Sequence, residues 1–172
     1  PEYKAGDTIP TKTGNYYMVI FSSSQDRAPA AIAKPLKHQM VYFVGDSRTV
    51  GLQSALGNSA PSNVDFVCKG MQGLTWFQQE GYKTLVSKLA QQPTNTKKAV
   101  IVNFGVNDMS NISSYVTYMK RVSQNLKKNY NCEMYYLSVN PLNSAMIRRY
   151  GGATRTEAQV AAFNKTIYQQ LC

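Results

Sequence analysis

Long hydrophobic runs are missing from this chain of 172 residues. No apolar stretch approaches the roughly 18 residues that a helix needs to span a bilayer, so we expect no transmembrane segment. The sequence also lacks a P-loop and a Gly-x-Gly-x-x-Gly pattern, which counts against a nucleotide-binding enzyme. It begins with Pro1 and has no readable signal peptide, so we expect a processed start or a shortened chain.

Acidic residues are scarce, at nine against nineteen Lys and Arg, which gives a net charge of +10. Such a charge favours polyanionic partners, among them nucleic acid and anionic cell-wall polymer. The basic residues are spread along the chain in short pairs such as Lys97-Lys98 and Arg148-Arg149, and no RNA-binding motif is present. The pattern favours a solvated basic surface and counts against a nucleic-acid partner. An anionic cell-wall polymer stays open as the alternative partner.

Cysteine and histidine are rare, with three cysteines and one histidine in the whole chain. The cysteines have no metal-site spacing, and nothing in the sequence implies a metal or an organic cofactor. Cys68 lies in an apolar run and is expected to be a buried thiol. Cys132 begins a predicted strand and Cys172 ends a predicted helix, and these ends approach one another in a βαβ unit. A Cys132–Cys172 bridge would suit a protein outside the cytoplasm.

Apolar runs alternate with stretches of helical spacing from residue 40 onward. Predicted strands cover residues 40–44, 63–68, 99–104 and 133–139, and predicted helices cover 49–56, 74–91, 112–128 and 156–171. This alternation predicts a three-layer α/β/α fold with a parallel, flavodoxin-like sheet. Residues 40–172 form the predicted domain, and the Pro- and Gly-rich residues 1–39 an arm or linker. Because the chain stops on a helix, we expect the last strand to be missing.

Two of the predicted strands end in polar turns that belong at the same edge of the sheet. Gly45-Asp46-Ser47 follows the first strand, and Gly105-Val106-Asn107-Asp108 follows the third. Open α/β sheets bind ligands at this carboxyl edge. Ser47 is the candidate nucleophile, although a serine hydroxyl needs a base to accept its proton. Backbone N–H groups of Ser47 and around Gly73, together with the Asn107 side chain, are candidate donors to an oxyanion.

These residues resemble three of the four sequence blocks of the SGNH (GDSL-type) hydrolases, over residues 40–172. The resemblance implies an esterase fold in which Ser47 is the nucleophile and Ser47, Gly73 and Asn107 form the oxyanion hole. Asp46 and Asp108 would be supporting residues. Arg48 would either bind an anionic or hydroxyl-rich substrate or lie on the surface.

The fourth block of that family, Asp-x-x-His, is missing, and with it the base and its orienting carboxylate. The single histidine, His38, precedes the first strand, about 25–30 Å from Ser47 along extended chain, whereas a base needs about 3 Å. Either the block lies beyond residue 172, or the protein is a natural variant without the base. Loss of triad members costs on the order of 10⁴–10⁶ in turnover, so these 172 residues alone should be nearly inactive.

We therefore expect a secreted or cell-wall-associated serine esterase that removes acyl groups, chiefly acetyl, from a carbohydrate or cell-wall glycan. An O-acyltransferase of the same fold would share its acyl-enzyme. The alternatives are a non-catalytic carbohydrate or cell-wall binding domain and, less favoured, a phosphate binder using Gly45–Thr49 at a helix start. Specificity is expected from the loops at 57–62 and 140–152.

Overall fold

The sheet of this protein has four parallel strands in the part of the chain that the structure describes. The structure is a computed structural model, and it describes residues 39–141 and 155–171. The strand order is β2-β1-β3-β4. The strands are β1 Met40–Gly45, β2 Val64–Cys68, β3 Lys98–Asn103 and β4 Cys132–Tyr136. Each predicted strand is therefore present, to within a few residues at its ends.

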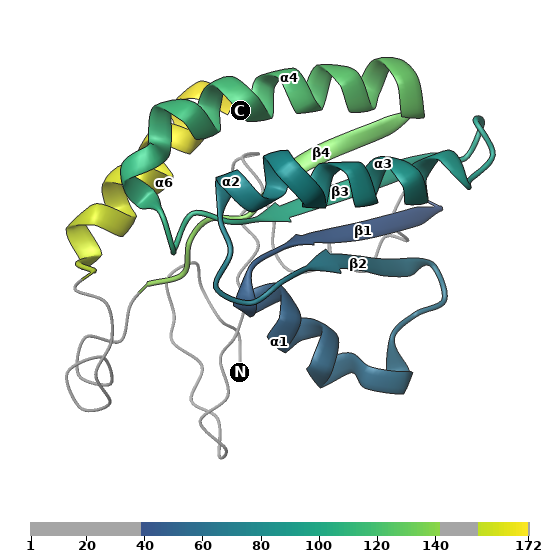
Figure 1. The fold of residues 1–172 in the computed structure, drawn as a ribbon, viewed down its shortest axis with the longest axis horizontal. Coiled ribbons are helices and arrows are strands. Elements are labelled where there is room, and N and C mark those ends of the chain that lie inside the picture. Colours follow the sequence, from purple (N-terminus) through teal and green to yellow (C-terminus); the bar gives the residue numbers. More distant parts are fainter. Residues whose placement is uncertain (1–38, 142–154, 172) are drawn as a thin grey trace, which may run out of the picture.

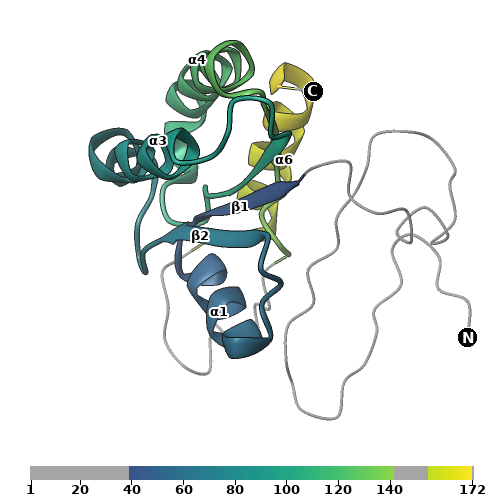
Figure 2. The ribbon, with the colours of Figure 1, turned by 90° about the vertical axis from the view of Figure 1, so that its right-hand side faces the viewer.

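Helices cover both faces of the sheet (Figures 1 and 2). Helix α1 lies on one face, and α3, α4 and α6 lie on the other. The helices are α1 Ser47–Leu56, α2 Leu74–Trp76, α3 Tyr82–Ala90, α4 Ile112–Tyr130 and α6 Glu157–Leu171. Shorter turns are η2 Gly57–Ser59, the π-helical turn η3 Phe77–Gly81, and η4 Met109–Asn111. This arrangement confirms the predicted three-layer α/β/α fold with a flavodoxin-like sheet.

The main core lies between the sheet and helices α3, α4 and α6, which pack on one of its faces. Helix α4 contributes a stripe at helical spacing, including Tyr115, Met119 and Leu126, all fully buried. Each buried aliphatic side chain of this kind contributes about 1.5–3 kcal/mol to folding. This stripe is the core-facing side of α4.

The strand register aligns the carboxyl ends of β1, β2 and β3. Gly45, the last residue of β1, pairs with Cys68 of β2 on one side and with Asn103 of β3 on the other. The loops that follow these strands therefore start at one edge, on the left in Figure 1. This edge is the one at which the sequence places its polar turns.

Three boundaries differ from the sequence prediction. Helix α1 begins at Ser47, two residues early, because the Asp46 side chain caps it. The predicted helix at 74–91 contains the π-helical turn η3. The fourth strand ends at Tyr136, and beyond it Val139 forms 2.8 Å hydrogen bonds through both its N–H and its carbonyl with the Asn164 side chain of α6. The Asn164 side chain therefore forms the hydrogen bonds with Val139 that a neighbouring strand would otherwise form.

The Cys132–Cys172 bridge is not formed, because Cys132 is a free, buried thiol. Cys172 itself lies outside the described residues, as do His38, nearly all of the predicted arm at 1–39 and most of the predicted loop at 140–152. Cys68 is half-buried, less enclosed than expected, and its thiol donates to Gln53 Oε1 at 3.3 Å.

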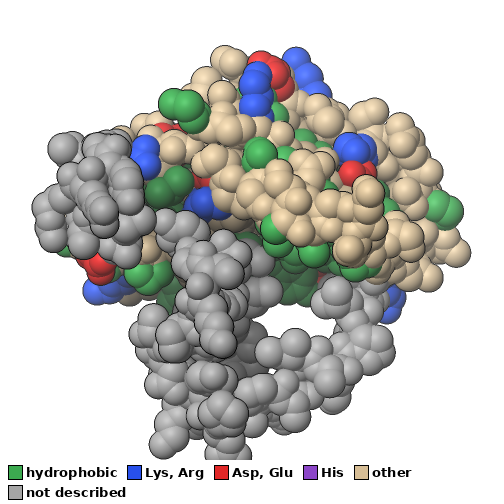
Figure 3. All heavy atoms as spheres, turned by 90° about the horizontal axis from the view of Figure 1, so that it is seen from below, with side chains coloured by type: hydrophobic (Ala, Val, Ile, Leu, Met, Phe, Trp, Pro, Cys, Tyr) green, Lys and Arg blue, Asp and Glu red, His purple; other side chains and the backbone are tan. Residues whose placement is uncertain are grey.

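Two surface properties bear on partners. Among the helices that the structure describes, none combines the length and apolarity needed to cross a membrane. Lys and Arg side chains lie at separate places on the face shown in Figure 3 and do not gather into one patch there.

Candidate functional site

Ser47 lies exposed in the first turn of α1, directly after the buried end of β1. Only Asp46 separates strand from helix, and its extended backbone (φ −87°, ψ −156°) makes the turn sharp. A Cβ on Gly45 would lie 2.1 Å from Thr49 Oγ1 and 2.6 Å from the Asn103 carbonyl oxygen. The close approach of α1 to the sheet therefore requires glycine. Because Ser47 opens the helix, negative charge at its hydroxyl is favoured by the helix dipole.

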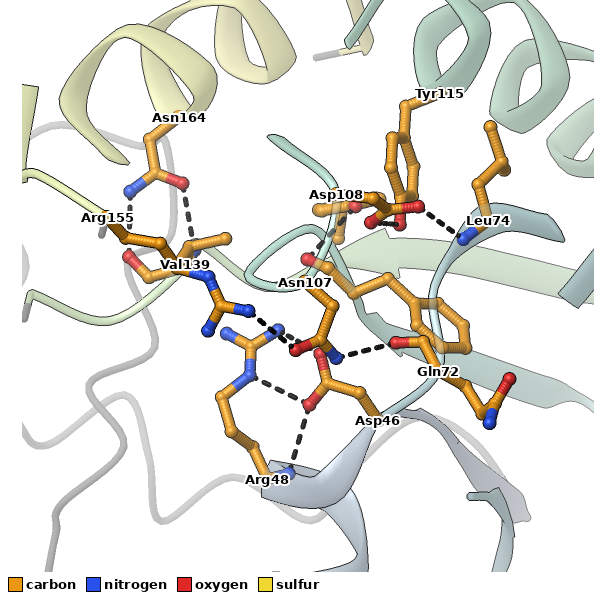
Figure 4. Close-up of polar contacts among 12 residues, drawn as sticks. Asp46, Arg48, Gln72, Leu74, Asn107, Asp108, Tyr115, Val139, Arg155 and Asn164 are labelled. Carbon is orange, nitrogen blue, oxygen red and sulfur yellow. Dashed lines mark hydrogen bonds and ion pairs between the residues drawn. The ribbon is translucent and has the colours of Figure 1, made fainter. Parts of the chain in front are cut away.

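Asp46 and Arg48, the two sequence neighbours of Ser47, form a bidentate ion pair (Figure 4). Arg48 Nε donates to Asp46 Oδ1 at 3.0 Å, and Arg48 Nη2 donates to Asp46 Oδ2 at 2.8 Å. The Arg48 backbone N–H also donates to Oδ1, which caps the helix. Asp46 is fully buried, and the Arg48 side chain is 20% exposed. Both oxygens of Asp46 are therefore occupied.

One atom of this pair stands apart: Arg48 Nη1 is buried without a hydrogen-bond partner among the described residues. The guanidinium is turned inward onto Asp46 and is not spread over the surface. The sequence leaves two roles open for Arg48, substrate binding and a position on the surface. The geometry adds a third, because Arg48 fixes the Asp46 carboxylate that caps α1.

Asp108 joins the loop after β3 to the loop after β2. Its Oδ2 accepts from the Leu74 N–H at 2.9 Å, and its Oδ1 accepts from the Tyr115 hydroxyl at 2.6 Å. Gly73 precedes Leu74, and a Cβ there would lie only 2.3 Å from the Asp108 carboxylate. The carboxylate therefore takes the place of a side chain at residue 73 and holds the start of α2.

Burial raises the pKa of Tyr115 far above its ordinary value, with further increases from nearby Tyr136 and from Asp108. Burial also raises the pKa of Tyr136, where Arg48 acts in the opposite direction and Asp108 and Asp46 add to the increase. Both phenols therefore stay protonated and serve as hydrogen-bond donors. The Tyr136 hydroxyl donates a hydrogen bond to the Phe104 carbonyl oxygen at 3.3 Å.

The Asn107 side chain is held from two sides (Figure 4). Its Nδ2 donates to the Gln72 carbonyl at 2.7 Å, and its Oδ1 accepts from Arg155 Nη2 at 3.3 Å. Arg155 lies two residues before α6, whose first turn is capped by reciprocal hydrogen bonds between Thr156 and Gln159. Because an amide nitrogen carries two hydrogens, one hydrogen of Asn107 Nδ2 is left for another acceptor.

The structure thus brings Ser47, Gly73 and Asn107 to one edge of the sheet, Ser47 in the first turn of α1 and the other two in the loops after β2 and β3. It adds residues that the sequence reasoning missed as site residues: Tyr115, Arg155 and Gln72. Tyr115 lies on the apolar stripe of α4, and a phenol on such a stripe is the signal that could have revealed it. No comparable signal exists for Gln72, which acts through its backbone.

A base for Ser47 is missing from the described residues. They contain no histidine, and the oxygens of Asp46 and Asp108 are engaged as described above. No group of three or more His, Cys, Asp or Glu side chains in the described ranges could hold a metal ion. The arrangement offers a hydroxyl at a helix N-terminus and N–H donors around it, which is the equipment needed to receive an oxyanion.

Comparison with protein-family models found no match for this sequence, and neither did comparison with curated proteins.

Proposed function

We propose that this protein is a serine esterase of the SGNH type that removes acetyl groups from a carbohydrate or cell-wall glycan. The observation that carries the proposal is the exposed Ser47 at the start of α1, at the same sheet edge as Gly73 and Asn107. Secretion, or attachment to the cell wall and its anionic polymer, belongs to the same proposal and rests on the basic composition.

In the proposed reaction, Ser47 Oγ attacks the ester carbonyl carbon and its proton passes to a base. The carbonyl oxygen becomes an oxyanion that accepts from the N–H groups of Ser47 and Gly73 and from Asn107 Nδ2. The bond to the sugar oxygen then breaks, and the sugar leaves as an alcohol after protonation. Water releases acetate from Ser47, whereas a sugar hydroxyl in its place would make the protein an acyltransferase.

The proposed base is a histidine beyond residue 172, because His38, the single histidine of the sequence, precedes the first strand and both aspartates of the site are engaged. That engagement also favours a second candidate function, a carbohydrate or cell-wall binding domain that retains the cleft without catalysis. The two candidates differ in one chemical property, the nucleophilicity of Ser47, since an activated serine reacts with phosphonates and an unactivated one does not.

The test is intact-mass analysis of the full-length native protein after treatment with a serine-reactive phosphonate. We expect one adduct on the native protein, none on Ser47→Ala, and one on Ser54→Ala, which removes an exposed serine from the same helix. Absence of any adduct on the native protein would reject the esterase and leave the binding domain. An adduct that persists in Ser47→Ala would show that a different serine reacts.

A further inference from the structure

A cavity of about 280 Å³ opens beside Asn107, between the loop after β2, the helical run from α2 to η3, and the loop after β3. Its lining includes Gln72, Thr75, Trp76, Gln79, Asn107 and Asn111. The volume lies just below the roughly 300–1,000 Å³ of pockets for drug-sized ligands. It therefore suits a ligand of one ring and its substituents.

The polar groups around the cavity are mainly amides. Four of its side chains, from two glutamines and two asparagines, can each donate and accept hydrogen bonds, and Thr75 adds a hydroxyl. A sugar hydroxyl likewise donates and accepts, so amides are suitable partners for it in either sense. A purely apolar acyl chain would leave these amides unpaired at a cost.

Charge around the cavity disfavours an anion. No Lys or Arg is among its lining residues as the structure describes them, although the chain has nineteen. Two carboxylates are present, those of Glu80 and Asp108. Asp108 has both oxygens engaged, while Glu80 accepts from Trp76 Nε1 at 3.1 Å and lies 3.6 Å from Lys69 Nζ at the surface. An acidic sugar would meet this negative charge without a cation in the cavity to balance it.

The wall formed by η3 is fixed in place. The Trp76–Glu80 hydrogen bond spans the π-helical turn, and a Cβ on Gly81 would lie 2.8 Å from the Trp76 ring. The ring therefore packs directly over the backbone of the turn that presents Gln79. A preformed wall of this kind loses little freedom when a ligand binds.

We propose that this cavity binds one neutral, hydroxyl-rich ring, the sugar unit that carries the ester. The link to the ester rests on the proposed function, because the cavity shares Gly73 and Asn107 with the proposed oxyanion site. Binding of the ring itself does not depend on catalysis. The residues that select the ring, Thr75, Gln79 and Asn111, lie outside the motifs that carry the resemblance.

Trp76 makes the proposal directly measurable, because it is the only tryptophan of the chain and lines the cavity. The experiment is a titration of the protein with methyl β-D-glucoside, N-acetylglucosamine and glucuronate, followed by tryptophan fluorescence. We expect a saturable change with the neutral sugars in the millimolar range, and binding of glucuronate at least several-fold weaker.

Gln79→Ala removes one exposed amide of the cavity and should weaken neutral-sugar binding about tenfold. Gln124→Ala removes an exposed glutamine from α4, outside the cavity, and should leave binding unchanged. The proposal is overturned if neither neutral sugar gives saturation, if glucuronate binds as tightly, or if the two variants behave alike. Sugar binding without phosphonate labelling would reject the esterase and support the sugar site. Labelling without sugar binding would support the esterase and reject the sugar site.

Discussion

The phenol of Tyr115 donates a 2.6 Å hydrogen bond to Asp108, seven residues earlier in the chain, and through it fixes a third segment. The second oxygen of Asp108 accepts from the Leu74 N–H, 34 residues away in sequence. A core residue of α4 therefore determines where the loop after β2 ends and where α2 starts. This arrangement supports the proposed oxyanion site from behind.

Tyr115→Phe should destabilise the fold by about 1–3 kcal/mol, because it removes the buried donor of a hydrogen bond to the half-buried Asp108 carboxylate. The ring itself stays, so its packing against Phe163 is preserved. Urea denaturation measures the loss. Tyr168→Phe, which alters a 59% exposed phenol, should change stability by no more than about 0.5 kcal/mol. Equal effects for the two variants would show that the Tyr115 hydroxyl contributes nothing specific.

The strands and helices could be predicted from the sequence because their signals are local. The buried parallel strand β1 is one continuous apolar run, and α4 repeats its apolar residues at helical spacing. The edge that carries Ser47 and Asn107 followed from the topology, since every parallel strand ends on the same side. These features need no knowledge of which side chains meet.

The contacts that complete the site could not be predicted in this way. Asp108 with Leu74 and Arg155 with Asn107 join residues 34 and 48 positions apart. They depend on how loops pack after the sheet has formed, and polar loop residues carry no periodicity. The π-helical turn η3 was missed because four of its five residues are ordinary in an α-helix. In the structure the Trp76 ring packs over the fifth, Gly81.

Gly45→Ala should destabilise the protein by about 3 kcal/mol, because the new Cβ would overlap Thr49 and the Asn103 carbonyl. A backbone carbonyl in β3 cannot rotate away, so α1 or β1 would have to shift. Gly51→Ala, in the same turn-and-helix unit, meets nothing within 4 Å and should stabilise by about 0.5–1 kcal/mol through helix propensity. We expect urea denaturation to give a lower free energy of unfolding for Gly45→Ala and a higher one for Gly51→Ala. An unchanged free energy of unfolding for Gly45→Ala would contradict the close approach of α1 to the sheet.

Two ion pairs of the protein should differ greatly in their contribution to stability. Arg48→Met leaves the fully buried Asp46 carboxylate unpaired and should cost about 3–5 kcal/mol. Lys88→Met breaks a pair with Asp65 whose side chains are 33% and 38% exposed, and should cost at most about 1 kcal/mol. The Lys88 contact is the shorter, at 2.6 Å against 2.8 Å. A larger loss of stability for Lys88→Met than for Arg48→Met would follow the two distances instead of the two degrees of burial, and would contradict this prediction.

The Cys132 thiol should be protected from alkylation over a wide pH range. Burial raises its pKa to about 12 from an ordinary value of 9.0, and the Lys98 ammonium only partly offsets this. Because the folded pKa is raised, the neutral thiol favours the folded state fully below pH 9, and this stabilisation is lost as the pH rises toward about 12. In the native protein, iodoacetamide labelling of Cys132 should rise about tenfold per pH unit from pH 8.5 to 10.5, since only the thiolate reacts.

The same labelling in denaturant separates a free thiol from a bridge. Without reductant, the unfolded chain should label Cys132 readily, with a rate that levels off above about pH 9, because the pKa returns to its ordinary range once the thiol is in water. Peptide mapping assigns the label, with half-buried Cys68 as the internal comparison. A native rate that levels off near pH 9 would contradict the burial of Cys132. Labelling of the unfolded chain that appears only after reduction would mean that Cys132 is oxidised in the native protein, contrary to the free thiol found in the structure.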